Sequence, residues 1–570
     1  MDSQLGSFMS QGTPDQLVAP VVGPPIANQE DALHSDPNSD VVATANTGGV
    51  PDDQPLTTSN ATPSLTDENT GTESESLGAL GDTFLSSVVL LLGMTVAQKA
   101  IGFLRTIIVC RLLPPEEMGM WAMLQTTIAT ILPILLLSIP ACFGRYFEFY
   151  RGRQQLRAFL RQATLLCSGL LVAGIGLLVL LRQPIAGLTL GSTELGMMIV
   201  ASAIALVPFA IFCFLTEMLT ALRFSRLTTA GHFINGTTLA VISVGLLFST
   251  SRTAMVMLFA FGAAHLLALL WLITRLRPVL KSVPTDRQKL SFVSTWSGMV
   301  PIILLFWFND FMTNMFNMSD RYMLVNLLPG SHQEVMEQIG NYESGHIIPV
   351  LFATVTMLIA KTLMPYLANA WEKQDFRLVS QQTNLSLKLV TCVTVLGGLM
   401  FLPTSGFVFD TIFQGKYDGG AAVLPYVVFF YVGSGFTALI MNYFWCAHRA
   451  PWAILALVLG VAINVSVNLL LVQRMGIVGA AIGTVFGIAC QVVCLWTLAV
   501  FFGMKLDRGT VVLSLSSVLL LLNTAYWPLW CLIVVGALFA PGVLDADDRT
   551  ILGNAAQTLR TKLSVLNGLR

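Results

Sequence analysis

Stretches of predominantly apolar residues, each about 20 residues long, follow one another from Phe84 onward with only short polar connections. A stretch of this length is what an α-helix needs to cross the hydrocarbon core of a bilayer, where the backbone must satisfy its own hydrogen bonds. We therefore expect an all-α integral membrane protein. The predicted spans are 84–108, 121–142, 159–181, 195–219, 233–250, 254–274, 292–316, 346–367, 385–402, 421–445, 452–472 and 477–501.

One further apolar region, 510–540, is too long for one straight helix and short for two. Asn523, Tyr526 and Pro528 interrupt it near the middle, which favours a tight hairpin of two short helices. The prediction is therefore about 14 transmembrane helices, or 13 if the region 510–540 forms a single span. The 570 residues are 54% hydrophobic and only 11% charged, whereas soluble domains carry about a quarter charged residues, so a soluble enzyme is excluded.

Residues 1–82 differ from the rest of the chain in composition. They contain 13 acidic residues and no Lys or Arg, and they are rich in Ser, Thr, Asn, Gly and Pro. Such a segment cannot bury enough apolar surface to offset its ordering entropy, and it lacks the basic and apolar regions of a signal peptide. We expect a disordered acidic cytoplasmic tail.

The basic residues after the tail are concentrated in alternate short connections, and the loop 275–291 is one of the most basic. Because Lys and Arg are enriched in cytoplasmic loops, this bias places both termini in the cytoplasm. The same loop divides the first twelve spans into halves of six. The predicted domains after the tail are two six-helix bundles (83–275 and 276–505), two extra helices (506–541) and a cytoplasmic amphipathic tail (542–570).

A weak internal repeat supports this division. Gly119-Met120-Trp121 stands before the second span and Gly340-Asn341-Tyr342 before the eighth, which are corresponding positions in the two halves. With six spans each, the two repeats would have the same topology and would be related by an axis along the membrane normal.

Polar residues inside the spans are candidate site residues, because ionisable groups are costly in a bilayer. Thr95, Gln98, Gly102 and Arg105 fall on one face of the first span, with Lys99 on a neighbouring face. These positions suggest a hydrated cavity between the halves that carries positive charge and suits an anionic passenger such as a phosphate or pyrophosphate. The alternative is that Lys99 and Arg105, and likewise Arg321 after the seventh span, snorkel to the membrane interface.

The seventh and eighth spans supply the other candidates. Asp310, Asn314, Asn317 and Arg321 share a helical face in and after the seventh span, with Asp320 adjacent, while Lys361 lies deep in the eighth. Asp310 and Asp320 are candidates for a coupling proton or cation, although Asp310 could simply neutralise Lys361 or Arg321. Two further ionisable residues have structural readings, namely Glu217 as a partner of Arg223 and His265 as a packed, hydrogen-bonded side chain.

The sequence predicts no metal site and no cofactor. The nine cysteines lie in or beside apolar segments without the spacing of a zinc site or a disulfide framework, so we interpret them as packing residues. The acidic cluster Asp545, Asp547 and Asp548 could hold a metal in a glycosyltransferase, but it precedes an amphipathic pattern and better fits the start of a surface helix.

The stretch Arg105 to Tyr150, with Arg111-Leu112-Leu113-Pro114, Glu117-Met118-Gly119, Pro140 and Arg145-Tyr146, resembles the opening of the polysaccharide and O-antigen flippases. Ser319-Asp320-Arg321-Tyr322, Gly340-Asn341-Tyr342 and Pro365 resemble the seventh and eighth spans of that family, which belongs to the multidrug/oligosaccharidyl-lipid/polysaccharide exporter superfamily. The likeness covers roughly residues 80–560.

This resemblance implies two six-helix bundles facing each other in a V, with two extra C-terminal helices. It implies a transporter, not an enzyme, that flips undecaprenyl-diphosphate-linked oligosaccharide from the inner to the outer leaflet of the bacterial cytoplasmic membrane by alternating access. In the family, cationic cavity residues hold the pyrophosphate and sugar acids, and Arg105 and Arg321 occupy the matching positions. The partners it implies are the lipid-linked oligosaccharide, the bilayer and polysaccharide polymerase or assembly proteins, without nucleic acid.

Three alternatives remain open from the sequence. A multidrug/cation antiporter of the same superfamily would need a cavity dominated by acids, whereas the candidate stripes are mostly basic. A lipid II flippase is a close variant of the leading hypothesis. A membrane glycosyltransferase or polymerase would need a catalytic outer loop, and the connection 317–345 carries Asp320, His332, Glu334, Glu337 and Glu343 without a convincing catalytic arrangement.

Overall fold

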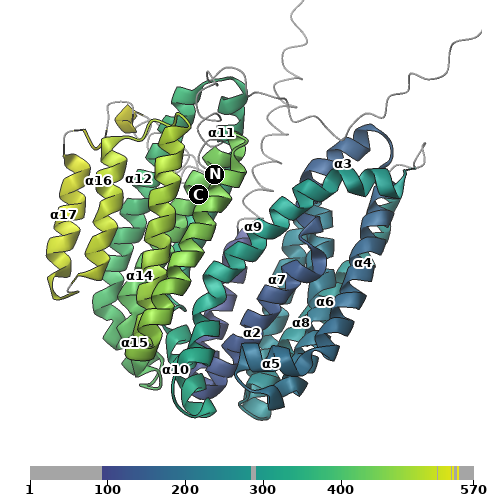
Figure 1. Cartoon of the computed structure of the whole chain (residues 1–570), viewed down its shortest axis with the longest axis horizontal. Coiled ribbons are helices and arrows are strands. Elements are labelled where there is room, and N and C mark those ends of the chain that lie inside the picture. Colours follow the sequence, from purple (N-terminus) through teal and green to yellow (C-terminus); the bar gives the residue numbers. More distant parts are fainter. Residues whose placement is uncertain (1–92, 284–289, 523, 541, 545–547, 551–570) are drawn as a thin grey trace, which may run out of the picture. The chain divides into compact units, whose positions relative to one another are not determined.

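The computed structural model describes residues 93–550, apart from 284–289, 523, 541 and 545–547 (Figure 1). The predicted tail 1–82 and most of the predicted amphipathic tail 542–570 therefore lie outside the described residues. Within the described part of the chain the regular elements are all helices and no strand occurs. The predicted all-α class is confirmed.

Eleven helices are long and apolar enough to cross a membrane among the described residues. The chain is a multi-pass integral membrane protein. The first of these helices is Gly93–Leu112. The others contain the labelled α-helices α2 (Pro115–Leu136), α4 (Leu156–Leu180), α6 (Gly196–Ala221), α7 (Ser225–Ser249), α8 (Ala254–Ser282), α9 (Phe292–Leu327), α11 (Val350–Glu372), α12 (Phe376–Phe401), α14 (Leu424–Cys446) and α15 (Ala450–Phe501).

Helix α15 accounts for two predicted spans. It is 52 residues long, and Gly476 interrupts its helical backbone with φ 60° and ψ −135°. This left-handed value of φ is one that glycine adopts without a Cβ penalty, so the residue fits the break. The two segments on either side of Gly476 correspond to the predicted spans 452–472 and 477–501.

The shorter helices lie between or after the spans. The predicted hairpin over 510–540 is present as two short apolar helices, Arg508–Leu521 and Thr524–Phe539. These two segments contain the α-helices α16 (Arg508–Leu515) and α17 (Trp527–Phe539). The other short α-helices are α3 (Phe143–Gly152), α5 (Arg182–Leu190), α10 (His332–Ser344) and α13 (Ser405–Phe407).

The chain divides into two compact units, which we describe separately. The described part of the smaller unit is Gly93 and residues 291–300, where the rings of Phe292 and Trp296 lie 6.1 Å apart. The larger unit contains residues 94–290 and 301–570, and all contacts described below lie within it.

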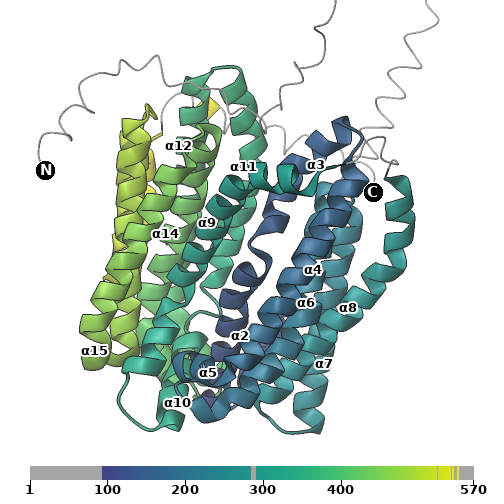
Figure 2. The same ribbon diagram turned by 45° about the vertical axis from the view of Figure 1, so that its right-hand side comes forward.

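Helix contacts within the larger unit form two groups. In one group α2, α4, α6, α7 and α8 pack on one another, and in the other α11, α12, α14, α15 and α16 do so. Helix α10 connects the groups because it packs along α2 and also contacts α15, as Figure 2 shows for α2 and α10. The proposed domain boundaries at 275 and 505 remain a prediction.

Two glycines allow α2 and α10 to approach closely. A Cβ added to Gly119 would lie 1.8 Å from the Met336 carbonyl oxygen, and one added to Gly340 would lie 2.0 Å from the Pro115 carbonyl oxygen. Both clashes are with backbone atoms, which cannot move aside as a side-chain tip can. The two glycines of the predicted internal repeat therefore meet at this contact, where small residues let helix backbones come together.

Replacing either Gly119 or Gly340 by alanine is expected to lower the thermal stability of the detergent-solubilised protein. Overpacking a close contact typically costs about 1–3 kcal/mol, and the backbone clash places these variants at the upper end. Gly169→Ala in α4 is the matched control, because a Cβ there meets nothing within 4 Å. If Gly119→Ala and Gly340→Ala have the same melting temperature as the wild type and as Gly169→Ala, the close contact is absent in solution.

The seventh span continues beyond its predicted end. Helix α9 runs to Leu327, so Asn317, Asp320 and Arg321 lie on a helix, where a connection starting near 317 had been expected. Hydropathy marks a span's end where polar residues begin, but here partners from other helices satisfy those polar residues. The rest of the predicted 317–345 connection contains α10, which begins with a capping box between Ser331 and Glu334.

One acidic residue assigned to a surface helix is buried. Asp548 is 4% exposed and forms an ion pair with Lys388 at 2.7 Å, and Asp507 pairs with the same ammonium group. The surface interpretation of Asp548 is therefore wrong. It failed because the sequence pattern near 548 contains no sign of a lysine 160 positions earlier.

Candidate functional site

The structure separates the predicted site residues into two groups on different sets of helices. The first, which we call the Arg105 site, comprises Arg105, Arg321, Glu343, His346 and Tyr431. The second, the Lys361 cluster, comprises Lys99, Glu217, His232, Asp310 and Lys361.

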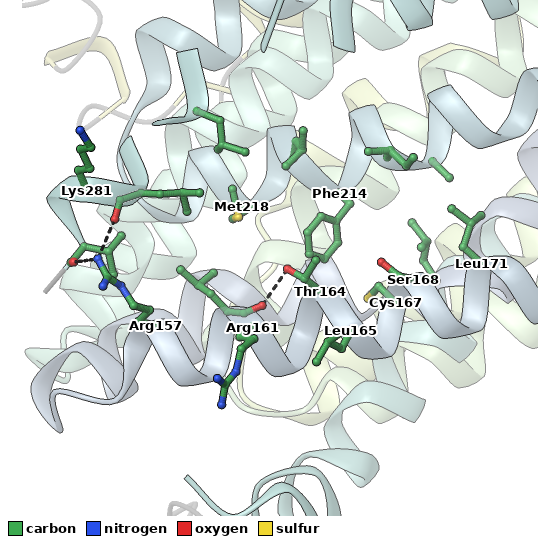
Figure 3. Close-up of a pocket in the computed structure, with 18 residues that line it drawn as sticks. Arg157, Arg161, Thr164, Leu165, Cys167, Ser168, Leu171, Phe214, Met218 and Lys281 are labelled. Atoms are coloured by element: carbon green, nitrogen blue, oxygen red, sulfur yellow. Dashed lines mark hydrogen bonds between the residues drawn. The ribbon is translucent and has the colours of Figure 1, made fainter. Parts of the chain in front are cut away.

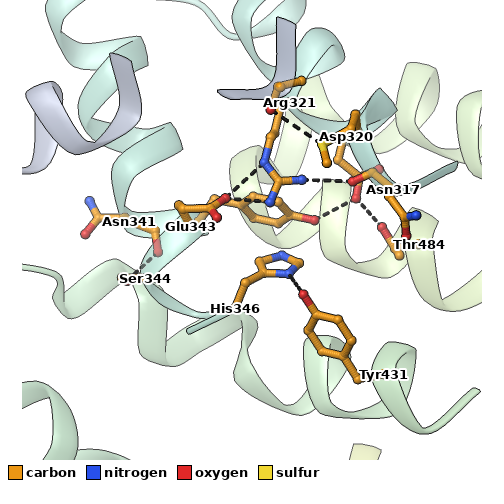
Figure 4. Close-up of polar contacts among 12 residues, drawn as sticks. Asn317, Asp320, Arg321, Asn341, Glu343, Ser344, His346, Tyr431 and Thr484 are labelled. Carbon is orange, nitrogen blue, oxygen red and sulfur yellow. Dashed lines mark hydrogen bonds and ion pairs between the residues drawn. The ribbon is translucent and has the colours of Figure 1, made fainter. Parts of the chain in front are cut away.

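Arg321 of α9 forms an ion pair with Glu343 of α10 (Figure 4). Its Nε donates to Glu343 Oε2 at 2.9 Å, and its Nη1 donates to the Asn317 carbonyl oxygen at 2.9 Å. The Arg321 side chain is 8% exposed and that of Glu343 is 23% exposed. The guanidinium is thus held and largely neutralised by Glu343, which makes it a weaker candidate for direct anion binding than the sequence suggested.

Two small cavities flank Glu343. One of about 180 Å³ is lined by Arg105, Glu343, His346 and Tyr431, and the other of about 260 Å³ is lined by Arg321, Glu343 and residues of α2. Gln125 of α2 lines both. Glu343 therefore presents one face to Arg321 and remains accessible from a cavity that Arg105 also lines.

Arg105 has the least satisfied cation of this site. Its Nε is buried without a hydrogen-bond partner, and no described carboxylate forms an ion pair with it. A buried guanidinium is stabilised by an anion that accepts its fork of N–H donors, and phosphate oxygens match that geometry. Arg105 is therefore the described residue best suited to receive an anionic group from outside the chain.

Asp320 lies beside this site in a buried hydrogen-bond network. Its carboxylate accepts bonds from Tyr342 Oη at 2.6 Å, Asn464 Nδ2 at 3.0 Å and Asn468 Nδ2 at 2.8 Å, and from the Thr484 hydroxyl (Figure 4 shows Asp320 and Thr484). Asp320 is only 2% exposed. The network connects α9, α10 and both segments of α15.

The Asp320 network also contains an unpaired acceptor. Asn468 Oδ1 is buried and has no hydrogen-bond partner in the described structure. Carboxylate, amide and hydroxyl oxygens together are the ligands that hard cations prefer. Four donors already occupy the Asp320 carboxylate, so a cation bound there would have to replace at least one of them.

The Lys361 cluster collects charges from five helices. The ammonium of Lys361 in α11 interacts electrostatically with Glu217 of α6 and with His232 of α7. The ammonium of Lys99 also interacts electrostatically with His232. Glu217 also interacts electrostatically with Asp310 of α9. Lys99, Glu217 and Lys361 are exposed.

This arrangement changes two expectations about acids. Arg223 pairs with Glu148 at 2.9 Å, so the prediction that Glu217 serves Arg223 is wrong. Arg321 pairs with Glu343, which rules out Asp310 as its neutralising partner. The Lys361 cluster consequently contains two carboxylates beside its two lysines, where a mainly positive cavity had been expected.

The remaining predicted residues lie near these groups. Gln98 packs against Gly236, since a Cβ added to Gly236 would lie 3.1 Å from Gln98 Cγ. Asn314 and Asn317 each donate to a carbonyl four residues earlier in α9, at 2.8 and 2.9 Å. His265 is packed and hydrogen-bonded as expected, to the Phe261 carbonyl at 2.8 Å and to Asn235 at 3.2 Å.

Sequence reasoning missed most of the partners of Asp320 and the residues that line the cavity beside Arg105. Asn464 and Asn468 are polar residues four positions apart inside an apolar span, and this spacing places them on one helical face. The same rule that selected Asp310 could have selected them. His346 and Tyr431, which are hydrogen-bonded at 3.1 Å, carry no comparable local signal.

Burial of His346 between α10 and α11 makes the stability of the protein sensitive to acid. Burial, together with the charge of Arg321, lowers the pKa of His346 to about 3. The unfolded chain binds this proton near pH 6.5, so the free energy of unfolding falls as the pH drops from about 6.5 toward 3. Arg321 lowers the pKa of Glu343 although burial opposes this shift. Protonation of Glu343 therefore affects the free energy of unfolding only below its unfolded pKa of about 4.3.

His346→Gln is therefore expected to reduce the loss of stability between pH 7 and pH 5, by about 2 kcal/mol. The measurement is thermal unfolding of purified protein at both pH values, and the difference between them is compared across variants. His332→Gln, at an exposed histidine of α10, is the control. An unchanged difference in His346→Gln would mean that His346 is accessible to protons in the folded state.

No family model and no curated protein matches this sequence. Two solved structures resemble the model over most of their length. The lipid II flippase MurJ in an inward closed conformation aligns with a TM-score of 0.58 and 13% identity, covering 79% of this chain and 97% of MurJ. An inward-facing multidrug resistance MATE family transporter of the MOP superfamily aligns with a TM-score of 0.55 and 11% identity, covering 73% and 95%.

This chain has the MurJ/MATE transporter fold. The all-helical fold with its many predicted spans agrees with it. At these identities the likeness concerns the fold and leaves the cargo open.

Proposed function

We propose that the chain is a transporter of the MOP superfamily that moves a diphosphate-linked saccharide lipid from one leaflet of the bacterial cytoplasmic membrane to the other. The observation that carries this proposal is Arg105, a partly buried cation inside a span with an unsatisfied Nε and no ion pair among the described residues. A cation kept without a partner at membrane depth is costly, and such residues mark substrate pathways. The likeness to a lipid II flippase and a multidrug transporter supports the transporter class.

In this proposal Arg105 and Lys361 bind the diphosphate at successive stages of transport. Lys361 and Lys99 have exposed ammonium groups at the Lys361 cluster, and Arg105 lies near Glu343 and His346. Gln98, Asn314 and Asn317, which lie on the same helices, contribute hydrogen bonds to sugar hydroxyls, while Arg321 positions Glu343. The prenyl tail stays in the bilayer, as its hydrophobicity requires.

Transport against a gradient requires a coupled ion. Asp320 supplies a buried carboxylate that accepts hydrogen bonds from Asn464 and Thr484, and Asp310 adds a second carboxylate on the same helix. We assign ion coupling to Asp320, because an ion bound there replaces donors from α10 or α15 and so changes the contacts that hold these helices to α9.

A lipid II flippase is the second candidate within the same chemistry, since one structural neighbour bears that name. A multidrug/cation antiporter is favoured by a different observation, namely the two carboxylates Glu217 and Asp310 in the Lys361 cluster. The polymerase or assembly partners and the polysaccharide-specific cargo belong to the proposal alone.

The deciding experiment uses the full chain reconstituted in vesicles that contain a labelled undecaprenyl-diphosphate-linked oligosaccharide, lipid II or a cationic dye. The readout is the fraction of each substrate that becomes accessible to an impermeant reagent on the opposite side. Movement of a diphosphate lipid supports the proposal and ranks its two cargoes. Movement of the dye alone would replace it with the antiporter.

A further inference from the structure

A groove between α4, α6 and α8 has a basic end and a mostly apolar lining beyond it (Figure 3). It has a volume of about 620 Å³ and contains Arg157, Arg161 and Lys281, with no acidic residue among its described lining. Because α4 begins at Leu156 and α8 ends at Ser282, these three cations lie at the same end of the helices. We call it the basic-ended groove.

The cations differ in how they are held. Arg157 donates to the carbonyl oxygens of Leu280 and Val283 at 3.2 and 3.1 Å, which fixes its guanidinium at the end of α8. Arg161 and Lys281 are exposed, and no described carboxylate forms an ion pair with either. Two cationic heads are therefore available at a place where a third is already fixed.

Polar groups continue from the cations along α4. Arg161, Thr164 and Ser168 line the groove at spacings of three and four residues, so they fall on one helical face (Figure 3). Beyond them the lining is apolar, with Leu171 and Phe214. From Arg157 to Leu171 the groove follows α4 for roughly 21 Å, slightly more than the ~15 Å of one leaflet's hydrocarbon.

A second groove between the same three helices provides an internal comparison. It has a volume of about 780 Å³ and is lined by Ile175, Val179, Met255, Phe259 and other residues without a single charged or hydroxyl side chain. Both grooves suit acyl chains, since any lipid-facing groove in a bilayer is filled by them. Only the basic-ended groove has groups that select a headgroup.

We propose that the basic-ended groove is a binding site for one anionic glycerophospholipid, separate from the transport pathway. Arg161 and Lys281 bind the phosphate, and the positive charge of Arg157 attracts it as well. Thr164 and Ser168 lie at the level of the glycerol esters, and one acyl chain occupies the apolar part. Basic pockets between transmembrane helices are known to select anionic headgroups in this way.

The test is lipid retention measured by native mass spectrometry on the full chain, purified from nanodiscs that contain equal phosphatidylglycerol and phosphatidylcholine. We expect the wild type to retain phosphatidylglycerol preferentially. The double variant R161Q/K281Q should lose this preference, at about fivefold per cation removed. Lys373→Gln, an exposed lysine at the end of α11, is the matched charge control and should keep it.

Two further arms separate a lipid site from a simple anion site. Ser168→Trp fills the groove without changing its charge and should reduce retention of phosphatidylglycerol several-fold. Soluble glycerophosphate should not compete, because it lacks the chain that the groove accommodates. Retained preference in R161Q/K281Q, full retention in Ser168→Trp, or displacement by glycerophosphate would each overturn the proposal. None of these results depends on which cargo the transporter moves.

Discussion

Replacing Arg105 by alanine is expected to reduce flipping of a diphosphate-linked lipid by about 10- to 150-fold, while the protein remains folded. The physical reason is that hydrogen bonds to a charged group contribute about 1.5–3 kcal/mol, and the Arg105 guanidinium has no described ion-pair partner that its loss would leave unpaired. The measurement is the initial rate of lipid exposure in reconstituted vesicles, with the melting temperature recorded in parallel. Lys361→Ala is expected to act in the same direction.

Two comparisons make this prediction specific. Arg105→Lys keeps the charge but loses the planar fork, so its rate should lie between the wild type and Arg105→Ala. Arg252→Ala removes an exposed cation elsewhere and should flip at the wild-type rate. Wild-type rates for both Arg105→Ala and Lys361→Ala would leave the flippase proposal standing and remove these residues from its binding site.

Arg321→Met is expected to have the largest effect on stability. It leaves the Glu343 carboxylate in a largely buried position without the guanidinium that neutralises it, and breaking such a pair costs about 3 kcal/mol or more. The expected observation is a clear fall in melting temperature at pH 7, together with lower yield. Lowering the pH toward the point where Glu343 is protonated should reduce the difference in melting temperature between Arg321→Met and the wild type.

The double variant R321M/E343Q tests the cause. It removes both charges, so it should recover much of the stability that Arg321→Met loses, in agreement with the behaviour of buried ion pairs. A control at an exposed pair is Arg223→Met, which loses only a surface contact with Glu148 and should change the melting temperature little. If the double variant is no more stable than the single one, Arg321 stabilises the fold through packing.

The spans were predictable because hydropathy over about 20 residues is a local property of the chain. The short hairpin was also predictable, since Asn523, Tyr526 and Pro528 interrupt an apolar run that is too long for one helix. The end of α9 was not, because polar residues such as Asp320 stay helical when other helices supply their partners. Span boundaries of this kind depend on packing and leave no local pattern.

The candidate site was predictable by residue type and not by pairing. Depth in a span selected Arg105 and Lys361 as candidates, and a shared helical face selected Arg321, but neither criterion could tell which cation is neutralised. The Arg321 pair with Glu343 spans a connection of 22 residues, and Asp320 meets Asn464 across 144 residues. Such contacts follow from helix rotation and register in the folded chain, which a single sequence does not encode in any short segment.

The contact between Gly119 and Gly340 obeys the rule of an isologous interface, although it lies within one chain. Gly119 faces the carbonyl of Met336, four residues before Gly340, and Gly340 faces the carbonyl of Pro115, four residues before Gly119. In a two-fold dimer the same surface patch serves both subunits, so one residue type meets its own copy. Had two copies of an ancestral half-length chain paired in this way before they were fused, a single glycine would have satisfied both sides at once. After fusion the two positions could mutate independently, yet a side chain gained at either would still collide with the other half.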